Sequence, residues 1–480
     1  MTHFANAQDD IALARRLHDA HTIYKEAALT HRRFKHQDML PLLNQLTSQP
    51  VFQLSQVGES VEKRSIHQVK AGNGPAKVLL WSQMHGDEAT ATMAIFDIFN
   101  FLQGKNDGFD ELRASILSKT TLYFVPMLNP DGAERFQRRN ALDIDLNRDA
   151  LRLQSPEAIL LKNLQQTLQP LVGFNLHDQS PRYSIGKTGK QAAITFLATA
   201  YDENRSLNPV RERSMRLIVG MNRVLQQFIP GQVGRYDDEF EPRAFGDNIQ
   251  KWGTTLVLIE SGGYANDPEK QYLRQLNFVA ILTALKAIAD QSYEKETIDE
   301  YSAIPENGKQ LFDVLIRNAQ VNYNGASFKV DIGINRYEEN ADQSQRTIRP
   351  FFYRSVIEDI GDLSTFNGIE ELDATGLQVF PARIYPKTLK TTADLQKLKL
   401  DDLRRDGIVV FRTRKVAKNE FPAQPVHLLS DGQLSAQPLG IDQIPTFLLT
   451  DGAAIRYIFV NGFYNSTSRS TVLTHNGVAQ

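Results

Sequence analysis

The sequence predicts an α/β fold in which helices flank a mixed, mostly parallel sheet, followed by a smaller, β-sandwich-like C-terminal domain. Over residues 51–290, compact apolar runs alternate with longer segments of helical periodicity, a pattern typical of α/β domains. Beyond about residue 293, short β-rich runs separated by turn residues replace this alternation. The 480 residues, 41% of them hydrophobic, suffice for a large buried core and favour two or three domains over one.

The N-terminal residues 1–50 are predicted to form a helical segment that packs on the domain after it. Residues 11–29 place apolar groups three and four positions apart, with polar residues between them. The pattern then changes to that of strands. Residues 61–69 alternate loosely, and residues 77–81 (KVLLW) form a compact apolar run.

The following elements complete a predicted domain of residues 51–293. A helix is predicted over residues 87–102, with the acidic residues Asp87 and Glu88 in its first turn, where the helix dipole favours them. Further strands are predicted at residues 121–126, 171–176 and 254–259. Further helices are predicted at residues 156–168, 211–228 and 271–289. Ligands of such open sheets bind beyond the carboxyl ends of the strands, so polar residues directly after these runs are the candidates for a functional site.

The C-terminal part is predicted to be a separate β-rich domain, residues 309–480. Residues 294–308 (EKETIDEYSAIPENG) are polar, contain Pro and Gly, and are predicted to be a linker. Beyond them, strands are predicted at residues 312–316, 328–334, 408–412, 447–449 and 455–460.

Composition excludes several classes of function. The 54 basic and 56 acidic residues nearly balance, and no long run of one sign indicates nucleic acid as a partner. The chain has no cysteine, which excludes disulfides, thiolate metal sites and cysteine nucleophiles. The sequence predicts no membrane span and, as written, no secretory signal, so we expect a cytoplasmic protein, or a periplasmic or secreted one if a leader was trimmed.

Three residues that follow predicted strands form a candidate metal site. His85 and Glu88 form an H-x-x-E at the corner between the run KVLLW and the next helix, a spacing that lets an imidazole and a carboxylate face one point. His177 follows the apolar run GFNL and should reach the same edge of the sheet. Zinc accepts both ligand types, and a catalytic site uses three protein ligands and leaves one position for water. Taken singly, each residue has a more common explanation, a helix start or an ordinary histidine.

Glu260 is the candidate for a catalytic base. It ends the apolar run LVLI and precedes Ser261-Gly262-Gly263, where glycine lets the chain turn tightly and lets a substrate approach. A carboxylate at the edge of an apolar site should have a raised pKa, as a proton shuttle requires. The alternative is an ordinary glutamate at the end of a strand.

A segment between these elements carries candidate anion-binding side chains. Arg138, Asn147 and Arg148 lie after the predicted strand 121–126. Near a catalytic metal, an arginine either grips a substrate carboxylate through two hydrogen bonds or stabilises an oxyanion. The alternative is a solvated basic loop.

In order along the chain, these motifs resemble those of the zinc metallocarboxypeptidases, the carboxypeptidase A-like family. The similarity rests on H-x-x-E, N-P-D-G, the stretch R-x-N-x-x-x-x-D-L-N-R, a later histidine and a strand that ends I-E-S-G-G, and it covers roughly residues 35–290. The arginine-rich stretch, residues 138–148, keeps the spacing of the regulatory carboxypeptidase branch. The joint match in the correct order is far more specific than any single motif.

The resemblance implies a role for each matched residue. His85, Glu88 and His177 would bind one zinc ion, and Glu260 would take a proton from the zinc-bound water and deliver it to the leaving amine. Arg138 would polarise the scissile carbonyl.

Asn147 and Arg148 would hold the terminal carboxylate of the substrate. The family's mobile tyrosine has a counterpart by position in Tyr236, with Tyr264 and Tyr183 as alternatives.

The residue that sets side-chain preference is expected within residues 243–248. Asp247 would select a basic side chain, and Phe245 an apolar one; the sequence does not decide between them.

The C-terminal domain shows a second, fainter similarity, to the small β-sandwich of the cyclic amidohydrolases. It rests on residues 312–319, 330–334, 360–363 and 372–376. No H-x-H follows, and the remaining chain is too short for a catalytic barrel, so the resemblance implies a non-catalytic sandwich. The alternative is convergence among short strands.

The sequence therefore predicts a zinc-dependent hydrolase, first of all a carboxypeptidase that releases C-terminal amino acids from peptides. The expected partner is a peptide or N-acyl amino acid with a free carboxylate. Alternatives within the hydrolases are an N-acyl amino acid deacylase, aspartoacylase-like, and a peptidoglycan-peptide hydrolase. An alternative of another class is an inactive carboxypeptidase-like binding module. The presence of all three predicted metal ligands and of Glu260 argues against it.

Overall fold

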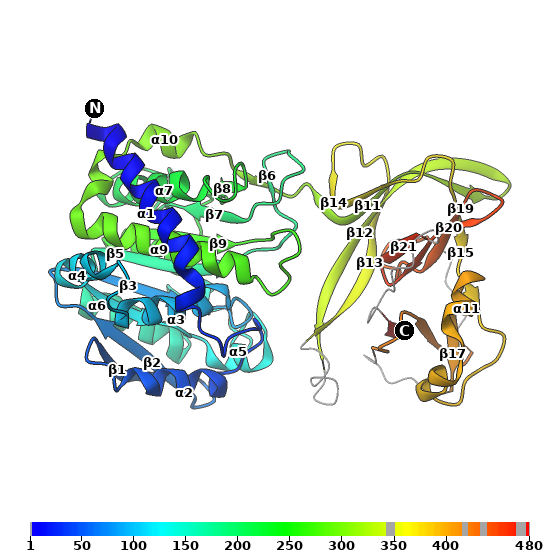
Figure 1. Cartoon of the computed structure of the whole chain (residues 1–480), viewed down its shortest axis with the longest axis horizontal. Coiled ribbons are helices and arrows are strands. Elements are labelled where there is room, and N and C mark those ends of the chain that lie inside the picture. The colour runs from blue at the N-terminus through cyan, green and yellow to red at the C-terminus, as the bar shows by residue number, and fades with distance from the viewer. Residues whose placement is uncertain (1, 342–350, 415–420, 433–438, 467–476, 480) are drawn as a thin grey trace. The chain divides into compact units, whose positions relative to one another are not determined.

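The chain folds into two units, and the apolar runs form the centre of the first. The structure, a computed structural model, describes residues 2–341, 351–414, 421–432, 439–466 and 477–479. The first unit comprises Met1–Gly186 and Lys190–Lys309, and the second comprises Lys187–Gly189 and Gln310–Gln480 (Figure 1). Among the described residues, no helix is both long and apolar enough to cross a membrane.

A single eight-stranded sheet organises the first unit, in the order β1-β2-β4-β3-β5-β9-β7-β8. Its strands are β1 (Phe52–Glu59), β2 (Ser65–Ala71), β3 (Ala76–Ser82), β4 (Thr120–Val125), β5 (Val172–Asp178), β7 (Ile194–Leu197), β8 (Val233–Arg235) and β9 (Thr255–Ser261). The central strands β4, β3, β5 and β9 run parallel, whereas β2 and β7 join them antiparallel at the two sides. The predicted mixed, mostly parallel sheet is therefore confirmed.

Helices cover both faces of this sheet. The α-helices of the first unit are α1 (Thr2–Tyr24), α2 (His36–Leu46), α3 (Thr90–Gln103), α4 (Asp110–Lys119), α5 (Pro130–Arg135), α6 (Pro156–Leu168), α7 (Pro209–Leu225), α8 (Phe245–Lys251), α9 (Gln271–Asp290) and α10 (Ile298–Ser302). Apolar side chains of α1, α3, α4, α7 and α9 form the larger core cluster, which includes Leu80 and Phe174 of the sheet. Those of α6 and α8 pack with Trp81 and Leu256 on the other face. Figure 1 shows α1 crossing over α9.

Several element boundaries differ from those predicted. The first helix ends at Tyr24 instead of residue 29, and α3 begins at Thr90, so Glu88 lies in the turn before the helix and not in its first turn. Residues 294–308 are not a bare linker: they contain α10 and the short strand β10 (Asn307–Gly308), which pairs with β6 (Ser184–Ile185). The apolar Tyr301 is buried there, which ties the segment to the first unit.

The second unit is built from two sheets. The larger has the order β13-β12-β11-β15-β19-β20-β21, with β14 also paired to β11, and the smaller has the parallel order β16-β17-β18-β22. The strands are β11 (Leu311–Tyr323), β12 (Ala326–Asn340), β13 (Phe351–Gly361), β14 (Asn367–Asp373), β15 (Gln378–Pro381), β16 (Arg383–Ile384), β17 (Ile408–Thr413), β18 (His427–Ser430), β19 (Phe447–Thr450), β20 (Ile455–Val460), β21 (Phe463–Ser466) and β22 (Val478–Ala479). The helix α11 (Leu400–Arg405) packs by β17. A further C-terminal sheet domain is thus present, and its similarity to the amidohydrolase sandwich stays a prediction.

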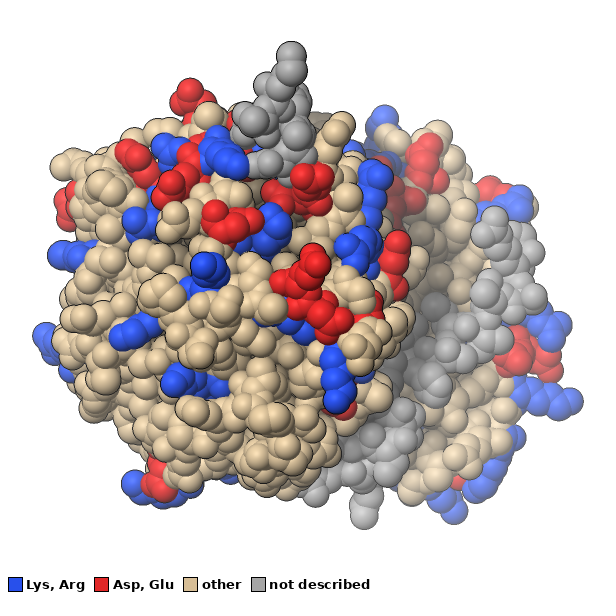
Figure 2. Space-filling view, turned by 60° about the vertical axis from the view of Figure 1, so that its left-hand side comes forward, with Lys and Arg blue, Asp and Glu red and all other residues tan. Residues whose placement is uncertain are grey.

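Positive and negative side chains lie close to one another on the face of the molecule that Figure 2 shows. Figure 2 shows Lys, Arg, Asp and Glu interspersed over the face turned toward the viewer, with uncharged surface between them. This view contains no extended field of one sign.

Candidate metal and carboxylate site

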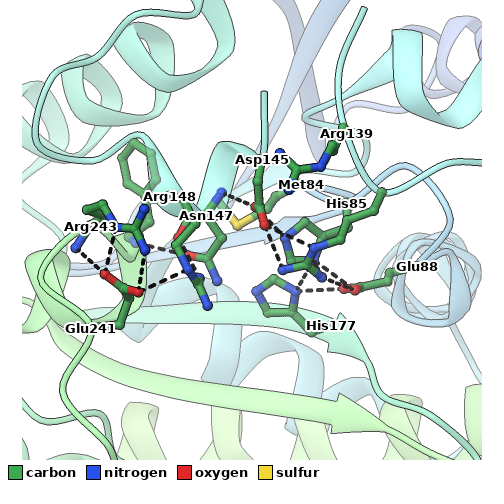
Figure 3. A network of polar contacts seen from close by, with 12 residues as sticks. Met84, His85, Glu88, Arg139, Asp145, Asn147, Arg148, His177, Glu241 and Arg243 are labelled. Atoms are coloured by element: carbon green, nitrogen blue, oxygen red, sulfur yellow. Dashed lines mark hydrogen bonds and ion pairs between the residues drawn. The ribbon is translucent and has the colours of Figure 1, made fainter. Parts of the chain in front are cut away.

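Three buried side chains from the carboxyl edge of the central strands converge on one point. His85 follows β3, Glu88 lies in the turn before α3, and His177 belongs to the end of β5. His85 Nδ1 lies 2.7 Å from Glu88 Oε1, and His177 Nδ1 lies 2.6 Å from Glu88 Oε2. The two Nδ1 atoms are 3.2 Å apart (Figure 3). The structure therefore brings together the three residues that the sequence predicts as metal ligands.

The local fold explains this convergence. Strands β3 and β5 are parallel neighbours, with Ser82 opposite Leu176, so residues beyond these positions meet at one edge of the sheet. The turn after His85 needs a glycine, because a Cβ at Gly86 would lie 2.0 Å from the backbone carbon of Gly132. A larger residue at position 86 would push the turn away from Gly132 and displace His85 and Glu88.

The chemistry of these groups fits a bound metal ion. Potential ligand atoms of His85, Glu88 and His177 all lie within 4.8 Å of one another. Two imidazole nitrogens and a carboxylate make a donor set that zinc accepts, and three protein ligands leave a coordination position open. His177 Nε2 is buried and has no hydrogen-bond partner among the described residues. The polar contacts of this ring are made by Nδ1, which faces Glu88 and His85.

Burial and the charges of the neighbouring groups shift the pKa values of all three residues. Burial opposes ionisation of Glu88, but the two imidazoles outweigh burial and hold the pKa of Glu88 well below its usual value. Burial lowers the pKa of His177. For His85, burial is outweighed by Glu88 and Asp145, so the pKa of His85 is raised.

Asp145 and Arg138 support the candidate metal ligands from the side. Asp145 Oδ1 lies 3.1 Å from His85 Nε2, so Nε2 donates to Asp145 and Nδ1 is the ring nitrogen that faces Glu88 and His177. Arg138 Nε donates to Asp145 Oδ2 at 3.0 Å, and Arg138 Nη1 lies 3.0 Å from His85 Nδ1 and 3.3 Å from Glu88 Oε1. No role for Asp145 was predicted from the sequence, although it is the aspartate of the D-L-N-R motif.

Glu260 lies beside this cluster on the neighbouring strand. Parallel strands β5 and β9 pair His177 with Glu260, which places both side chains on the same face of the sheet. Glu260 is buried, and its Oε2 atom has no hydrogen-bond partner among the described residues. Burial, with the negative charges of Glu88 and Asp178, raises the pKa of Glu260 well above its usual value. This carboxyl group is thus suited to hold and release a proton.

A buried lysine partly offsets the acidic charge behind Glu260. Lys270, directly before α9, forms an ion pair with Asp178 at 3.3 Å and donates to the carbonyl of Ser261 at 2.8 Å. Thr90 Oγ1 donates to the carboxylate of Asp178 at 2.7 Å. The backbone N–H of Asp178 donates to Glu88 Oε2 at 3.1 Å, so these contacts also hold Glu88 in place.

Asn147 and Arg148 lie further along the same network, on the short 3₁₀ helix Leu146–Arg148 (Figure 3). Asn147 Oδ1 accepts a hydrogen bond from the backbone N–H of Phe245 at 2.9 Å. Arg148 Nε lies 3.2 Å from Glu241 Oε2. Glu241 is therefore a charged neighbour of the predicted carboxylate-binding arginine, and no sequence motif indicated it.

Of the three tyrosines considered, Tyr236 and Tyr183 lie together. Their hydroxyl oxygens are 3.4 Å apart, and burial together with the charge of Glu260 raises the pKa of Tyr236. Tyr264 instead packs on Tyr272, with ring centroids 4.7 Å apart, against the larger core cluster. Tyr236 is thus the tyrosine whose pKa responds to Glu260, Tyr183 is its hydroxyl neighbour, and Tyr264 packs against the core.

The two side-chain candidates of residues 243–248 have different environments. Phe245 is fully buried and packs against Trp252 with Leu256 in the core, so its ring is committed to the interior. Asp247 is also buried, and its Oδ1 accepts from the backbone N–H of Glu241 at 3.2 Å. Burial raises the pKa of Asp247 to about 7.

Comparison with known proteins confirms the resemblance to the zinc carboxypeptidases. Residues 39–157 match the family model described as zinc carboxypeptidase, a segment that includes His85, Glu88 and Arg138. His177 and Glu260 lie beyond that segment, so their place beside it comes from the fold.

Curated relatives of this chain are named as carboxypeptidases. Carboxypeptidase 2 of Trichophyton tonsurans is 23% identical over 72% of this chain and 57% of its own length. Carboxypeptidase 2 of Trichophyton rubrum is 27% identical over 60% of this chain and 49% of its own length. The chain thus spans about half the length of the curated relatives it matches.

Two solved structures are among those that align with this chain. A metallo-carboxypeptidase from Burkholderia cenocepacia aligns with a TM-score of 0.45 and 17% identity, over 54% of this chain and 70% of its own. A metallo-carboxypeptidase from Pseudomonas aeruginosa, in complex with (2-guanidinoethylmercapto)succinic acid, aligns with a TM-score of 0.44 and 20% identity over the same shares.

Proposed function

We propose that this protein is a zinc-dependent metallocarboxypeptidase that releases C-terminal amino acids from peptides. One zinc ion would be held by His85 Nδ1, a carboxylate oxygen of Glu88 and His177 Nδ1. The observation that carries the proposal is the buried His85–Glu88–His177 cluster beside Glu260, a carboxyl group of raised pKa and no hydrogen-bond partner on Oε2 among the described residues. The family match of residues 39–157 supports the same class of reaction.

In this mechanism Glu260 moves the proton. Zinc, when bound, would supply a Lewis acid and lower the pKa of a coordinated water toward about 7. Glu260 Oε2 would accept a proton from the attacking water and then pass it to the nitrogen of the leaving amine. A carboxyl group whose pKa is raised by burial retains this proton between the two steps.

The arginines act on the charges of the substrate. Arg138, held by Asp145, would donate hydrogen bonds to the oxyanion that develops at the scissile carbonyl. Arg148 and the amide of Asn147 would hold the terminal carboxylate, which orients the last peptide bond at Glu260. Tyr236 would lie over the bound residue, and Asp247 would favour a basic or hydrogen-bonding side chain.

One assay tests the proposal against its rivals. The purified, zinc-loaded full chain is incubated with a mixed peptide library and with N-acyl amino acids, and products are identified by mass. We expect stepwise loss of C-terminal residues. Release of acyl groups alone would identify a deacylase, and zinc binding without any turnover would identify a binding module; either result refutes the carboxypeptidase.

Glu260→Gln tests the role of the proposed base. We expect this variant to bind zinc with near-normal affinity and to lose about 10²- to 10⁴-fold in kcat, the usual contribution of general acid–base catalysis. Near-normal turnover would show that another group moves the proton. Glu239→Gln, at an exposed position, serves as the control and should retain full activity.

A further inference from the structure

The arginine predicted to bind the substrate carboxylate already pairs with a carboxylate of the protein. Arg148 Nε and Glu241 Oε2 are 3.2 Å apart, and the side chains retain 38% and 28% of their exposure. Both groups are therefore open enough to solvent to exchange partners. The ion pair engages the Nε side of the guanidinium, while Arg148 Nη1 donates to the carbonyl of Asn147 at 2.8 Å.

Glu241 has a second cationic partner that holds it near Arg148. Arg243 Nε donates to Glu241 Oε1 at 3.0 Å, Arg243 Nη2 donates to Oε2 at 2.9 Å, and the backbone N–H of Arg243 donates to Oε1 at 3.1 Å. Arg243, and more weakly Arg148, hold the pKa of Glu241 below its usual value, so the carboxylate is charged at neutral pH. One carboxylate thus lies between two arginines (Figure 3).

The same segment also orients Asn147. Because Asn147 Oδ1 accepts from the N–H of Phe245, the amide oxygen faces residues 241–247 and the NH₂ group faces away from them. The donors of Asn147 are thereby presented on the side opposite to Phe245. The contacts that prepare this amide for a carboxylate therefore come from the segment that also supplies Glu241.

We propose that Glu241 is an internal competitor that occupies Arg148 in the free protein and that the terminal carboxylate of the substrate displaces. This rests on the proposed function, because it requires Arg148 to bind that carboxylate. On displacement Glu241 remains paired with Arg243, so its charge is not left without a partner. Glu241 is then an affinity-determining residue for free-carboxylate substrates, and Arg243 is the positioning residue that retains Glu241 after exchange.

The test compares ligands that differ only in the terminal charge. The probes are N-acetyl-Gly-Gly-Leu, N-acetyl-Gly-Gly-Phe, N-acetyl-Gly-Gly-Lys and N-acetyl-Gly-Gly-Glu, each as the free acid and as the C-terminal amide. Dissociation constants are measured by calorimetry on the zinc-loaded full chain that carries Glu260→Gln, so that hydrolysis of the probes is slowed to the residual rate of this variant. Ion pairs at such exposure contribute up to about 1 kcal/mol, so we expect Glu241→Gln to tighten binding of the acids about two- to fivefold and leave the amides unchanged.

Arg243→Gln should have the opposite effect. Without Arg243, the carboxylate of Glu241 depends on Arg148 alone, so binding of the acids should weaken about two- to fivefold. In the double variant Glu241→Gln/Arg243→Gln this loss should vanish, because the competitor is gone. A general disturbance of the segment would weaken binding in both single variants and would affect acids and amides alike. Glu239→Gln, which removes an exposed charge two residues away, should change neither.

The outcomes separate this inference from the proposed function. If the parent protein prefers acids to amides but Glu241→Gln leaves that preference unchanged or weakens it, the competitor is refuted and the proposed function stands. If Arg243→Gln still weakens binding of the acids in the Glu241→Gln background, Arg243 contacts the substrate directly and the positioning role is wrong. If the parent protein does not discriminate acids from amides, the role of Arg148 fails, and both proposals fail with it.

Discussion

Asp145 determines which nitrogen of His85 faces the candidate metal position. Its carboxylate lies 3.1 Å from Nε2, and its own pKa is lowered because His85 and Arg138 outweigh its burial. An ionised aspartate can only accept, so the imidazole carries a proton on Nε2. Nδ1 is therefore the nitrogen that a metal ion would bind, and the contact with Asp145 holds the ring so that Nδ1 faces Glu88 and His177.

Asp145→Asn should therefore weaken zinc binding. Substitution of such outer partners of a metal ligand typically reduces metal affinity about 10- to 100-fold, because both the orientation and the basicity of the imidazole decline. Zinc affinity would be measured by competition with a chromogenic chelator. Asp143→Asn is the matched control, because Asp143 is exposed two residues away and its side chain is replaced in the same manner. Equal affinity in all three proteins would show that Asp145 does not support the site.

Asp247 predicts a pH dependence of stability. Its pKa in the folded protein is about 7 because of burial, compared with about 3.9 in an unfolded chain. The folded state thus binds the proton more tightly, so the contribution is fully present below about pH 4 and is lost as the pH rises to about 7. Asp247→Asn should raise the free energy of unfolding of the first unit by about 2–4 kcal/mol at pH 8 and by little at pH 4.

Urea unfolding of Asp247→Asn and the parent protein at both pH values measures this difference. The exposed Asp237→Asn provides the control and should show no difference between the two pH values. If Asp247→Asn destabilises the protein equally at both pH values, the carboxyl group is ionised in the folded state, and its burial does not raise its pKa.

The functional residues that could be predicted from the sequence are those that follow apolar runs. His85, Glu88, His177 and Glu260 follow apolar runs, so the sequence placed them at one sheet edge, and the structure brings them together. The contact of Arg148 with Glu241 joins residues 93 positions apart, through a segment with no regular periodicity. The hydrophobic pattern of the sequence does not predict such pairs, because a charged loop residue has the same pattern around it whether it is solvated or forms an ion pair.

At the scale of elements, burial decided what could be predicted. Strands β3, β4, β5 and β9 are covered on both faces and appear in the sequence as apolar runs. The edge strands β1 and β8 and the four-residue β7 did not emerge, because they are short or carry exposed side chains. Helix α8 was missed for the same reason, since seven residues give too few turns to show a period.

A buried ionic cluster joins three helices that are far apart in the sequence. Asp97 of α3 accepts from His21 of α1 at 2.8 Å and from Arg274 Nε of α9 at 2.7 Å. All three side chains are buried, and Arg274 also donates to the carbonyl of Leu29 at 2.6 Å. This cluster joins α1 to α3 and α9 and so holds α1 against the rest of the first unit.

Asp97→Asn should destabilise the first unit strongly. Removal of one partner from a buried ion pair typically costs about 3–5 kcal/mol, because the remaining charge stays buried without compensation. Chemical unfolding followed by far-ultraviolet circular dichroism would measure the loss. Asp19→Asn, at an exposed position of α1, should change the free energy of unfolding by less than about 0.5 kcal/mol. A similarly small change for Asp97→Asn would mean that the cluster is solvated in solution.

At the scale of the whole molecule, the candidate site belongs to the first unit alone. Its residues lie between His85 and Glu260, within the first unit, and each unit has its own apolar core. In the sequence, the pattern of apolar runs changes near residue 293. The boundary itself falls at residues 309–310, because the predicted linker contains α10 and the buried Tyr301.

Metal removal should therefore affect one thermal transition and not the other. Two units with separate cores are expected to unfold in two calorimetric transitions. Zinc at a free concentration of 100 times its dissociation constant stabilises the state that binds it by about 2.7 kcal/mol, which shifts the midpoint of a unit of this size by about 4 °C. Chelation should lower the transition midpoint of the first unit by that amount and leave that of the second unchanged, as measured by scanning calorimetry of the full chain with and without chelator.

His177→Ala, which lacks one of the three ligands, should show the lower midpoint in both conditions. A shift of both transitions, or a response of His177→Ala equal to that of the parent protein, would place the metal elsewhere.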